Sequence, residues 1–223
     1  HLFEDVDSRS ARLVAEIVSR RSLAWLKAED SVALSDLFAT QLLRTHFSRT
    51  TPMRLAEDLR EMIRRVGYDP DTDPAMAMPT DSSLRLGAAE AFLGRHPHTG
   101  ALLRLRPALY TATGAGRFVI SDHPVTRTNA FLYGDHGLAS PGILVLLPSS
   151  PELTITLQCP TIVQRYESAS GMNLPPEQAT RARRYRDGLR SGEPIEIDDD
   201  MVIWANSHQI VQSRRYLYGA TDA

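Results

Sequence analysis

The chain has 223 residues, of which 42% are hydrophobic, and a formal net charge of −2. This composition is sufficient for a substantial core, and no run of about 18 apolar residues predicts a membrane-spanning helix. The one cysteine, Cys159, excludes an intrachain disulfide and is compatible with a cytoplasmic location. The one lysine, Lys27, lies outside any Gly-Lys-Ser/Thr sequence, which excludes a P-loop.

The N-terminal part of the chain, residues 8–95, is predicted to be helical. Apolar residues recur at helical spacing over residues 13–24 and again over residues 34–45, which indicates two amphipathic helices. Asp30 or Ser31 is the predicted N-terminal cap of the second helix, because a short polar side chain there satisfies free backbone N–H groups.

Two further helices are predicted before the chain changes character. The third begins at Thr51-Pro52, since proline suits the first helical position, and it has an apolar face over residues 55–66. A loop rich in aspartate and proline, residues 68–79, leads to a shorter helix at about residues 83–93.

Strand patterns begin at about residue 100 and continue to residue 160. Leucine alternates with arginine over residues 103–106, which predicts a strand with one wet face. The turn residues 113–116 predict a hairpin into a buried strand at residues 118–120. Two more strands are predicted, at residues 142–148 and 152–158.

The C-terminal part is predicted to return to helix. An arginine-rich helix at residues 176–189 precedes an acidic turn, and a last helix at residues 201–213 leads into a short strand at residues 216–218. Helices followed by adjacent strands predict an α+β fold, in which an N-terminal helical layer packs on a mostly antiparallel sheet that a C-terminal helix closes. We expect a single domain over residues 1–223.

Three segments together resemble a known family. They are Phe38-Ala39-Thr40-Gln41-Leu42-Leu43-Arg44-Thr45, Phe118-Val119-Ile120-Ser121-Asp122-His123-Pro124, and the stretch from Asn206 to Arg215-Tyr216-Leu217-Tyr218. In this order, over about residues 10–219, they resemble an uncharacterised, mainly bacterial family known as domain of unknown function 4238. The resemblance implies no activity.

Polar residues inside apolar segments are the candidate site. Gln41 and Arg44 lie in the second helix, and Ser121 and Asp122 follow a predicted buried strand. Buried polar groups need partners, so we expect Gln41, Arg44 and Asp122 to lie close together. Asn206 on the last helix joins them if it faces inward.

Two classes of function follow from this cluster. In the first, Gln41, Arg44, Ser121 and Asn206 bind a small anionic ligand or substrate, and Asp122 is the catalytic residue, either as a general base or as a metal carboxylate. In the second, arginine, aspartate and asparagine form a buried clamp in a non-enzymatic interaction or regulatory module. Asp122 before x-Pro more strongly favours a turn that ends the strand.

Other chemistry is predicted to be absent. A serine hydrolase is disfavoured because Gly-x-Ser-x-Gly does not occur. No metal site is predicted, because the histidines lack helical ligand spacing, and the sequence identifies no cofactor. No nucleic-acid binding is expected, because the acidic run of residues 193–200 follows the arginine-rich helix and offsets its charge.

Overall fold

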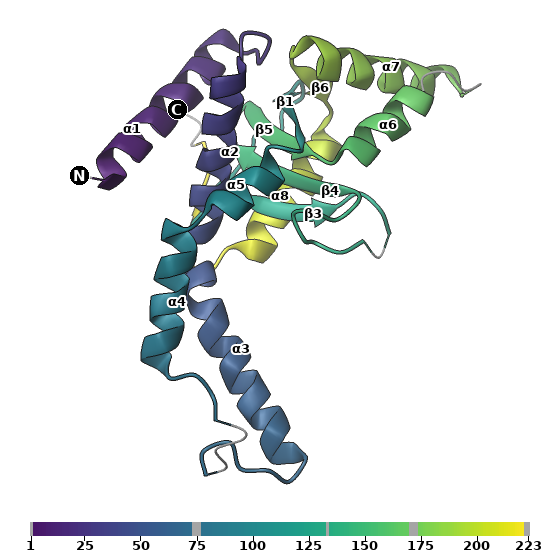
Figure 1. The fold of residues 1–223 in the computed structure, drawn as a ribbon. Helices are drawn as coiled ribbons and strands as arrows, with labels where there is room; N and C mark the ends of the chain where they lie inside the picture. The colour runs from purple at the N-terminus through teal and green to yellow at the C-terminus, as the bar shows by residue number, and fades with distance from the viewer. Residues whose placement is uncertain (1, 73–76, 133, 170–173, 221–223) are drawn as a thin grey trace.

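The computed structural model describes residues 2–72, 77–132, 134–169 and 174–220, and it has the predicted α+β fold (Figure 1). The described helices are α1 (Leu2–Arg20), α2 (Ala28–Leu43), α3 (His46–Arg65), α4 (Asp81–Leu93), α5 (His96–Leu102), α6 (Pro160–Ala169), α7 (Pro176–Ser191) and α8 (Asp199–Gln212). The described strands are β1 (Arg106–Ala112), β2 (Ile120–Ser121), β3 (Thr126–Asn129), β4 (Ile143–Pro148), β5 (Leu153–Gln158), β6 (Ile195–Ile197) and β7 (Leu217–Tyr218).

The main sheet has the strand order β3-β4-β5-β1-β6. Its neighbours are antiparallel except for β1 and β6, which run parallel with Tyr110 opposite Ile195. Each residue of β4 and of β5 is buried, so helices and loops cover both faces of these strands. The prediction of a mostly antiparallel sheet is confirmed, and α8 packs against β2 and β3 as the C-terminal helix.

The predicted stripe on α2 is confirmed as part of the core. Leu34, Leu37 and Phe38 are buried against the sheet. The helix begins earlier than predicted, at Ala28, and the predicted cap is wrong. Asp30 instead lies at the third helical position, where its carboxylate accepts a hydrogen bond from the Lys27 backbone N–H at 2.9 Å. The acidic side chain therefore satisfies the helix start from inside the first turn.

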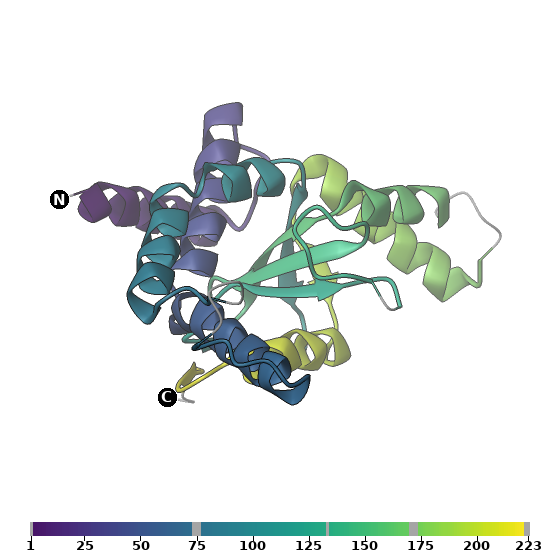
Figure 2. The ribbon, with the colours of Figure 1, turned by 60° about the horizontal axis from the view of Figure 1, so that its bottom comes forward.

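Helices α3 and α4, with their connection, form a hairpin that we call the arm, and the remaining elements form the body. The arm extends away from the sheet in Figure 1 and comes toward the viewer in Figure 2. The predicted start of α3 at Thr51-Pro52 is wrong, because Thr45 caps the helix by accepting the Ser48 N–H at 3.2 Å. Helix α4 begins two residues before the predicted start and ends at the predicted residue, so this prediction is confirmed. Part of the loop predicted at residues 68–79 lies outside the described residues.

The apolar face of the arm is mostly exposed. Ala56 is the one buried residue of α3 among those described, and α4 has none. Leu55, Met62 and Leu86 are each 60% exposed or more. The arm therefore derives little stability from a core of its own.

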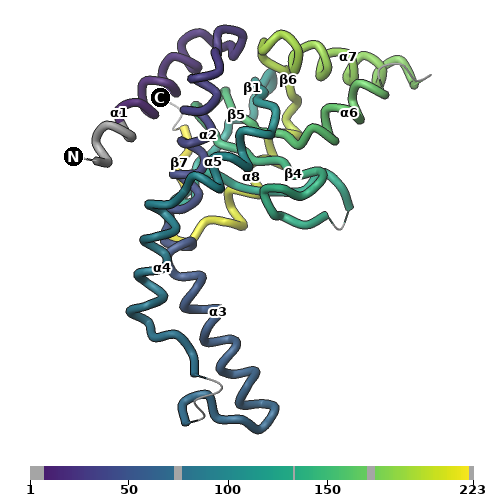
Figure 3. Tube along the Cα trace, viewed as in Figure 1, coloured from purple at the N-terminus to yellow at the C-terminus, as the bar shows by residue number. Residues whose placement is uncertain are grey.

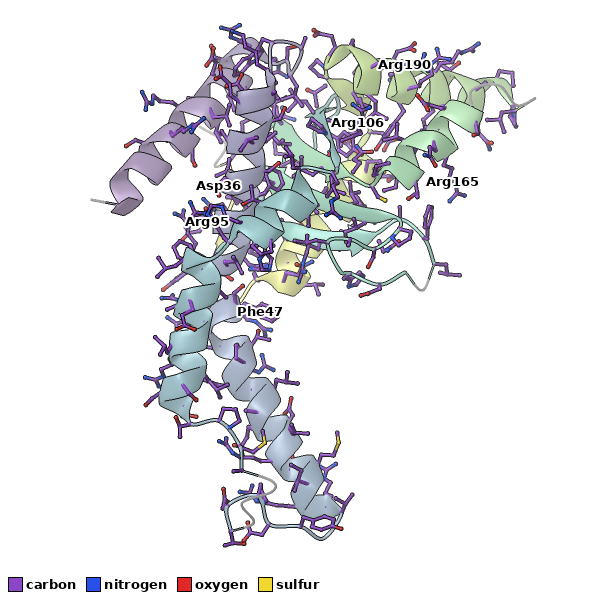
Figure 4. The ribbon with its side chains drawn as sticks, in the orientation of Figure 1. Asp36, Phe47, Arg95, Arg106, Arg165 and Arg190 are labelled. Atoms are coloured by element: carbon purple, nitrogen blue, oxygen red, sulfur yellow. The ribbon has the colours of Figure 1, made fainter. Side chains whose placement is uncertain are left out.

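The base of the arm is fastened to the body by an ion pair. Arg95, between α4 and α5, donates hydrogen bonds from Nε and Nη2 to the Asp36 carboxylate of α2 at 2.8 and 3.0 Å. Thr99 Oγ1 donates to the same carboxylate at 3.2 Å. Figure 4 shows Asp36 and Arg95 facing each other where α4 meets the body. The two side chains are only 26% and 16% exposed, so solvent screens this pair weakly.

The strand predicted at the start of the sheet is misplaced. Residues 103–105 form the turn between α5 and β1, and the strand begins only at Arg106. Helix α5 was not predicted, although Pro97 in its first turn is compatible with a helix start. Leu103 is 45% exposed while Leu105 is buried, so the alternation arises from the turn.

The predicted hairpin at residues 113–116 is also wrong, because β2 pairs with β7 and not with β1. The glycine-rich turn instead packs on the start of α8, where the Gly116 N–H donates to Asp199 Oδ1 at 2.8 Å. A Cβ on Gly114 would lie 2.2 Å from the same oxygen, so a larger residue at this position would displace the Asp199 carboxylate. Turn residues alone did not reveal that the pairing partner lies near the C-terminus.

Besides α5, the strands β3 and β6 and the ten-residue helix α6 were not predicted. Strands of three or four residues give too short a pattern to be distinguished from loop. Within the described residues, no helix combines the length and the apolar character needed to cross a membrane.

Candidate functional site

A cavity of about 690 Å³ lies where α1, α2 and the start of α3 meet the small β2–β7 sheet. We call it the polar cavity, because its lining includes three arginines and an aspartate beside apolar residues. Figure 3 shows β7 beside α2, which brings the C-terminal segment against the helical layer. Four of the predicted site residues line this cavity: Gln41, Arg44, Ser121 and Asp122. The structure thus brings together side chains from α2 and from the β2 strand end.

Gln41 and Arg44 form one wall of the cavity from the last turn of α2. They are three residues apart and share a helix face, so Arg44 Nε donates a hydrogen bond to Gln41 Oε1 at 3.0 Å. Arg44 is exposed and Gln41 is half-buried. The glutamine amide therefore orients the guanidinium at the mouth of the cavity.

Ser121 is a structural residue of the cavity floor. It is buried, its backbone N–H donates to Gln209 Oε1 at 3.0 Å, and its hydroxyl accepts from the His123 N–H at 3.2 Å. Gln209 on α8 is also buried and donates from Nε2 to the Pro124 carbonyl at 2.9 Å. The Ser121 hydroxyl is therefore committed to holding the turn after β2.

Asp122 is held by the backbone that leads into β7. Its Oδ1 accepts a hydrogen bond from the Arg214 N–H at 3.0 Å. Although partial desolvation opposes it, hydrogen bonding by the backbone N–H groups of Arg214, Arg215 and Tyr216 lowers the pKa of Asp122 below its ordinary value. A lowered pKa makes the carboxylate a weak proton acceptor near neutral pH. The catalytic role of Asp122 stays a prediction.

Asn206 does not line this cavity. Its Nδ2 donates to the Arg117 carbonyl at 2.8 Å, and its Oδ1 accepts the Val119 N–H at 3.0 Å. Both ends of the amide thus fasten α8 to the segment before β2. The buried arginine–aspartate–asparagine clamp is not formed, since Asn206 is committed elsewhere and Arg44 is exposed.

Sequence reasoning did not assign three cationic or titratable residues to the cavity, namely His46, Arg49 and Arg215. The spacing of Thr45 and Ser48 is a helix-start signature that would have moved the start of α3 and placed His46 and Arg49 in its first turns. No local signal marks Arg215, which reaches the cavity only because β7 pairs with β2.

The cavity has an excess of positive charge. Arg44, Arg49 and Arg215 line it, whereas Asp122 is the one carboxylate among its described lining residues. Neither Arg49 nor Arg215 forms an ion pair with a described residue. The start of α3 adds the partial positive charge of a helix N-terminus. The arrangement therefore favours an anion.

A buried histidine lies next to the cavity floor. His123 packs edge-on against Phe47 of α3, with ring centroids 5.6 Å apart, and Figure 4 labels Phe47 where the arm leaves the body. Burial, together with the positive charges of Arg127 and Arg214, lowers the pKa of His123 to about 4 despite the nearby Asp122 carboxylate. His123 is therefore neutral near pH 7 and contributes no charge to the site.

All three segments that carry the family resemblance contribute residues to the lining of this cavity. The model of a family described as protein of unknown function (DUF4238) matches residues 1–223. The chain belongs to the DUF4238 family. No curated protein and no solved structure matches it. Membership in DUF4238 relates this chain to other proteins of unknown function and assigns it no activity.

A metal site and a nucleic-acid-binding helix are two other kinds of site that the sequence analysis disfavours. Among the described residues, no group of three or more histidine, cysteine, aspartate or glutamate side chains is arranged to hold a metal ion. The arginine-rich helix α7 makes several ion pairs with acidic residues, among them Arg181 with Asp198 at 2.6 Å and Arg184 with Glu196 at 2.9 Å. Intramolecular carboxylates thus neutralise part of its charge.

Proposed function

We propose that this protein binds a small anionic ligand, carrying a carboxylate or phosphate group, in the polar cavity between α2, α3 and β7. The observation that carries the proposal is the charge of the lining. Three arginines, Arg44, Arg49 and Arg215, face a cavity in which the one described carboxylate, Asp122, is already bound by backbone N–H groups. An anion in the cavity would pair with Arg49 and Arg215, neither of which forms an ion pair with a described residue.

The donors suit oxyanion recognition. Guanidinium groups present paired N–H donors that match the oxygens of a carboxylate or phosphate. They reach the cavity from α2, α3 and the segment before β7, so a ligand that contacts all three ties the helical layer to the C-terminal segment. Each hydrogen bond to a charged group contributes about 1.5–3 kcal/mol to such binding.

The proposal is tested by thermal unfolding with inorganic phosphate and with acetate, at constant ionic strength set by sodium chloride. A ligand that binds the folded state alone raises its melting temperature, by an amount that corresponds to about 2.7 kcal/mol at a hundredfold excess over Kd. We expect such a rise for the wild-type chain. Arg49→Gln should weaken binding at least tenfold, which corresponds to about 1.4 kcal/mol.

The matched control is Arg54→Gln. Arg54 lies on the same helix, is exposed, and does not line the cavity, so its loss removes one positive charge without changing the site. Unchanged binding in Arg54→Gln and weaker binding in Arg49→Gln support the proposal. Equal effects in both variants would reduce it to unspecific attraction between charges.

Asp122 is assigned a positioning role in this proposal. Its carboxylate fixes the backbone of the segment that delivers Arg215 to the cavity. We further propose a bacterial, cytoplasmic protein, on the basis of the resemblance to a mainly bacterial family and of the free, buried Cys159.

A further inference from the structure

A second cavity of about 720 Å³ lies between the end of α2 and the two helices of the arm. Its lining is mainly apolar, with side chains from α2, α3 and α4. The apolar residues are Leu43, Met53, Ala88, Ala89, Phe92 and Leu93. The small side chains of Ala88 and Ala89 leave space between α3 and α4, which pack side by side along the arm.

The two cavities share a wall. Arg44, His46 and Arg49 line both the apolar cavity and the polar one. Arg85 of α4 adds a further guanidinium to the apolar cavity. The same side chains therefore border both an apolar cavity and an anion-favouring cavity, and each cavity has the volume of a small-molecule site.

From this juxtaposition we infer that the ligand is an anionic amphiphile, an alkyl or acyl chain that ends in a carboxylate or phosphate. The inference rests on the proposed function and extends it. The head group binds Arg44 and Arg49, and the chain lies between α3 and α4 against Met53 and Ala88. The methylene stems of the arginines extend the apolar wall while their guanidinium groups bind the head.

Isothermal titration with carboxylates of increasing chain length, from acetate through hexanoate to decanoate below its micellar concentration, tests this inference. Each methylene group that leaves water for the apolar cavity should raise affinity about fourfold. Decyl phosphate should bind as well, because the arginines recognise either anionic head group. The difference in affinity between decyl phosphate and decanoate identifies the preferred head group. Decanol, which has no charge, should bind at least tenfold more weakly than decanoate.

Ala88→Leu fills the apolar cavity, and Ala91→Leu is its matched control, because Ala91 lies on the same helix, is exposed and does not line the cavity. In Ala88→Leu the dependence of affinity on chain length should disappear while acetate binds as in the wild-type chain. Ala91→Leu should retain the dependence. Circular dichroism checks that both variants fold.

The outcomes separate this inference from the proposed function. If acetate and phosphate bind but affinity does not rise with chain length, the amphiphile is excluded and the anion site remains. If decanol binds as tightly as decanoate, the cavity accepts apolar molecules without regard to charge, which also overturns the inference. If no anion binds at all, the proposed function itself is wrong.

Discussion

The body and the arm contrast in how the same kind of sequence pattern is used. In the body, α2 buries its apolar stripe and β4 and β5 are buried throughout. In the arm, α3 and α4 have comparable apolar residues, yet Ala56 is the single residue of these two helices described as buried. Hydrophobic periodicity therefore shows which face of a helix is apolar, and tertiary structure decides whether anything covers that face.

The contrast predicts a large difference between core substitutions in the two regions. Ile155 of β5 is fully buried, so Ile155→Ala should lower the free energy of unfolding by about 3–4 kcal/mol through lost contacts and a cavity. Leu59 of the arm is 41% exposed, so Leu59→Ala should cost less than about 1 kcal/mol. Urea denaturation of both variants measures the two values, and similar losses would show that the arm has a core of its own.

A second prediction concerns His123, which contacts Phe47 where the arm joins the body. The unfolded chain takes up this proton at about pH 6.5, whereas the folded chain, with the pKa lowered to about 4, does not. Stability should therefore be fully present above pH 6.5 and fall by about 2–3 kcal/mol as the pH decreases to 4. Urea denaturation as a function of pH gives this curve.

The variant His123→Phe keeps a ring against Phe47 but has no proton to gain, so its stability should depend less steeply on pH over this range. The matched control is His96→Phe, which makes the same substitution at an exposed histidine. A curve for His123→Phe that superimposes on the wild-type curve would assign the acid sensitivity to other groups.

The smallest of the three effects is expected at the base of the arm. Asp36→Ala leaves Arg95 without its carboxylate in a weakly solvated place and should lower the free energy of unfolding by about 2 kcal/mol. Glu61 pairs with Arg65 on the exposed surface of the arm. Glu61→Ala should lower the free energy of unfolding by no more than about 0.5 kcal/mol. A double-mutant cycle with Arg95→Ala separates the pair from other effects. A coupling energy near zero would show that the pair does not fasten the arm.

Much of the architecture could be predicted from the sequence because it is encoded locally. The helical stripe of α2, the strands β4 and β5 and helix α7 all follow from periodicity within one segment. The pairing of β2 with β7 could not be predicted, because nothing in the turn at residues 113–116 indicates a partner near residue 217. Long-range pairing depends on the packing of the whole chain.

The candidate site shows the same limit. Gln41, Arg44, Ser121 and Asp122 were found because polar residues within apolar segments need partners. Arg49 is not predicted as a site residue, because the predicted start of α3 lies after it. Asn206 is predicted to join the site, because the sequence does not show that its side chain is used for hydrogen bonds to the backbone before β2. Residue type indicated which side chains need a partner, and topology decided which partner each one has.

The position of β1 in the sheet affects how the chain folds as it leaves the ribosome. Strand β1 lies between β5 and β6, and both partners are synthesised after it. Translation at about 5–20 residues per second leaves several seconds between the emergence of residues 110 and 195. A nascent chain that stalls before residue 195 exposes one edge of β1, and such an unpaired edge is a substrate for chaperones and a starting point for aggregation.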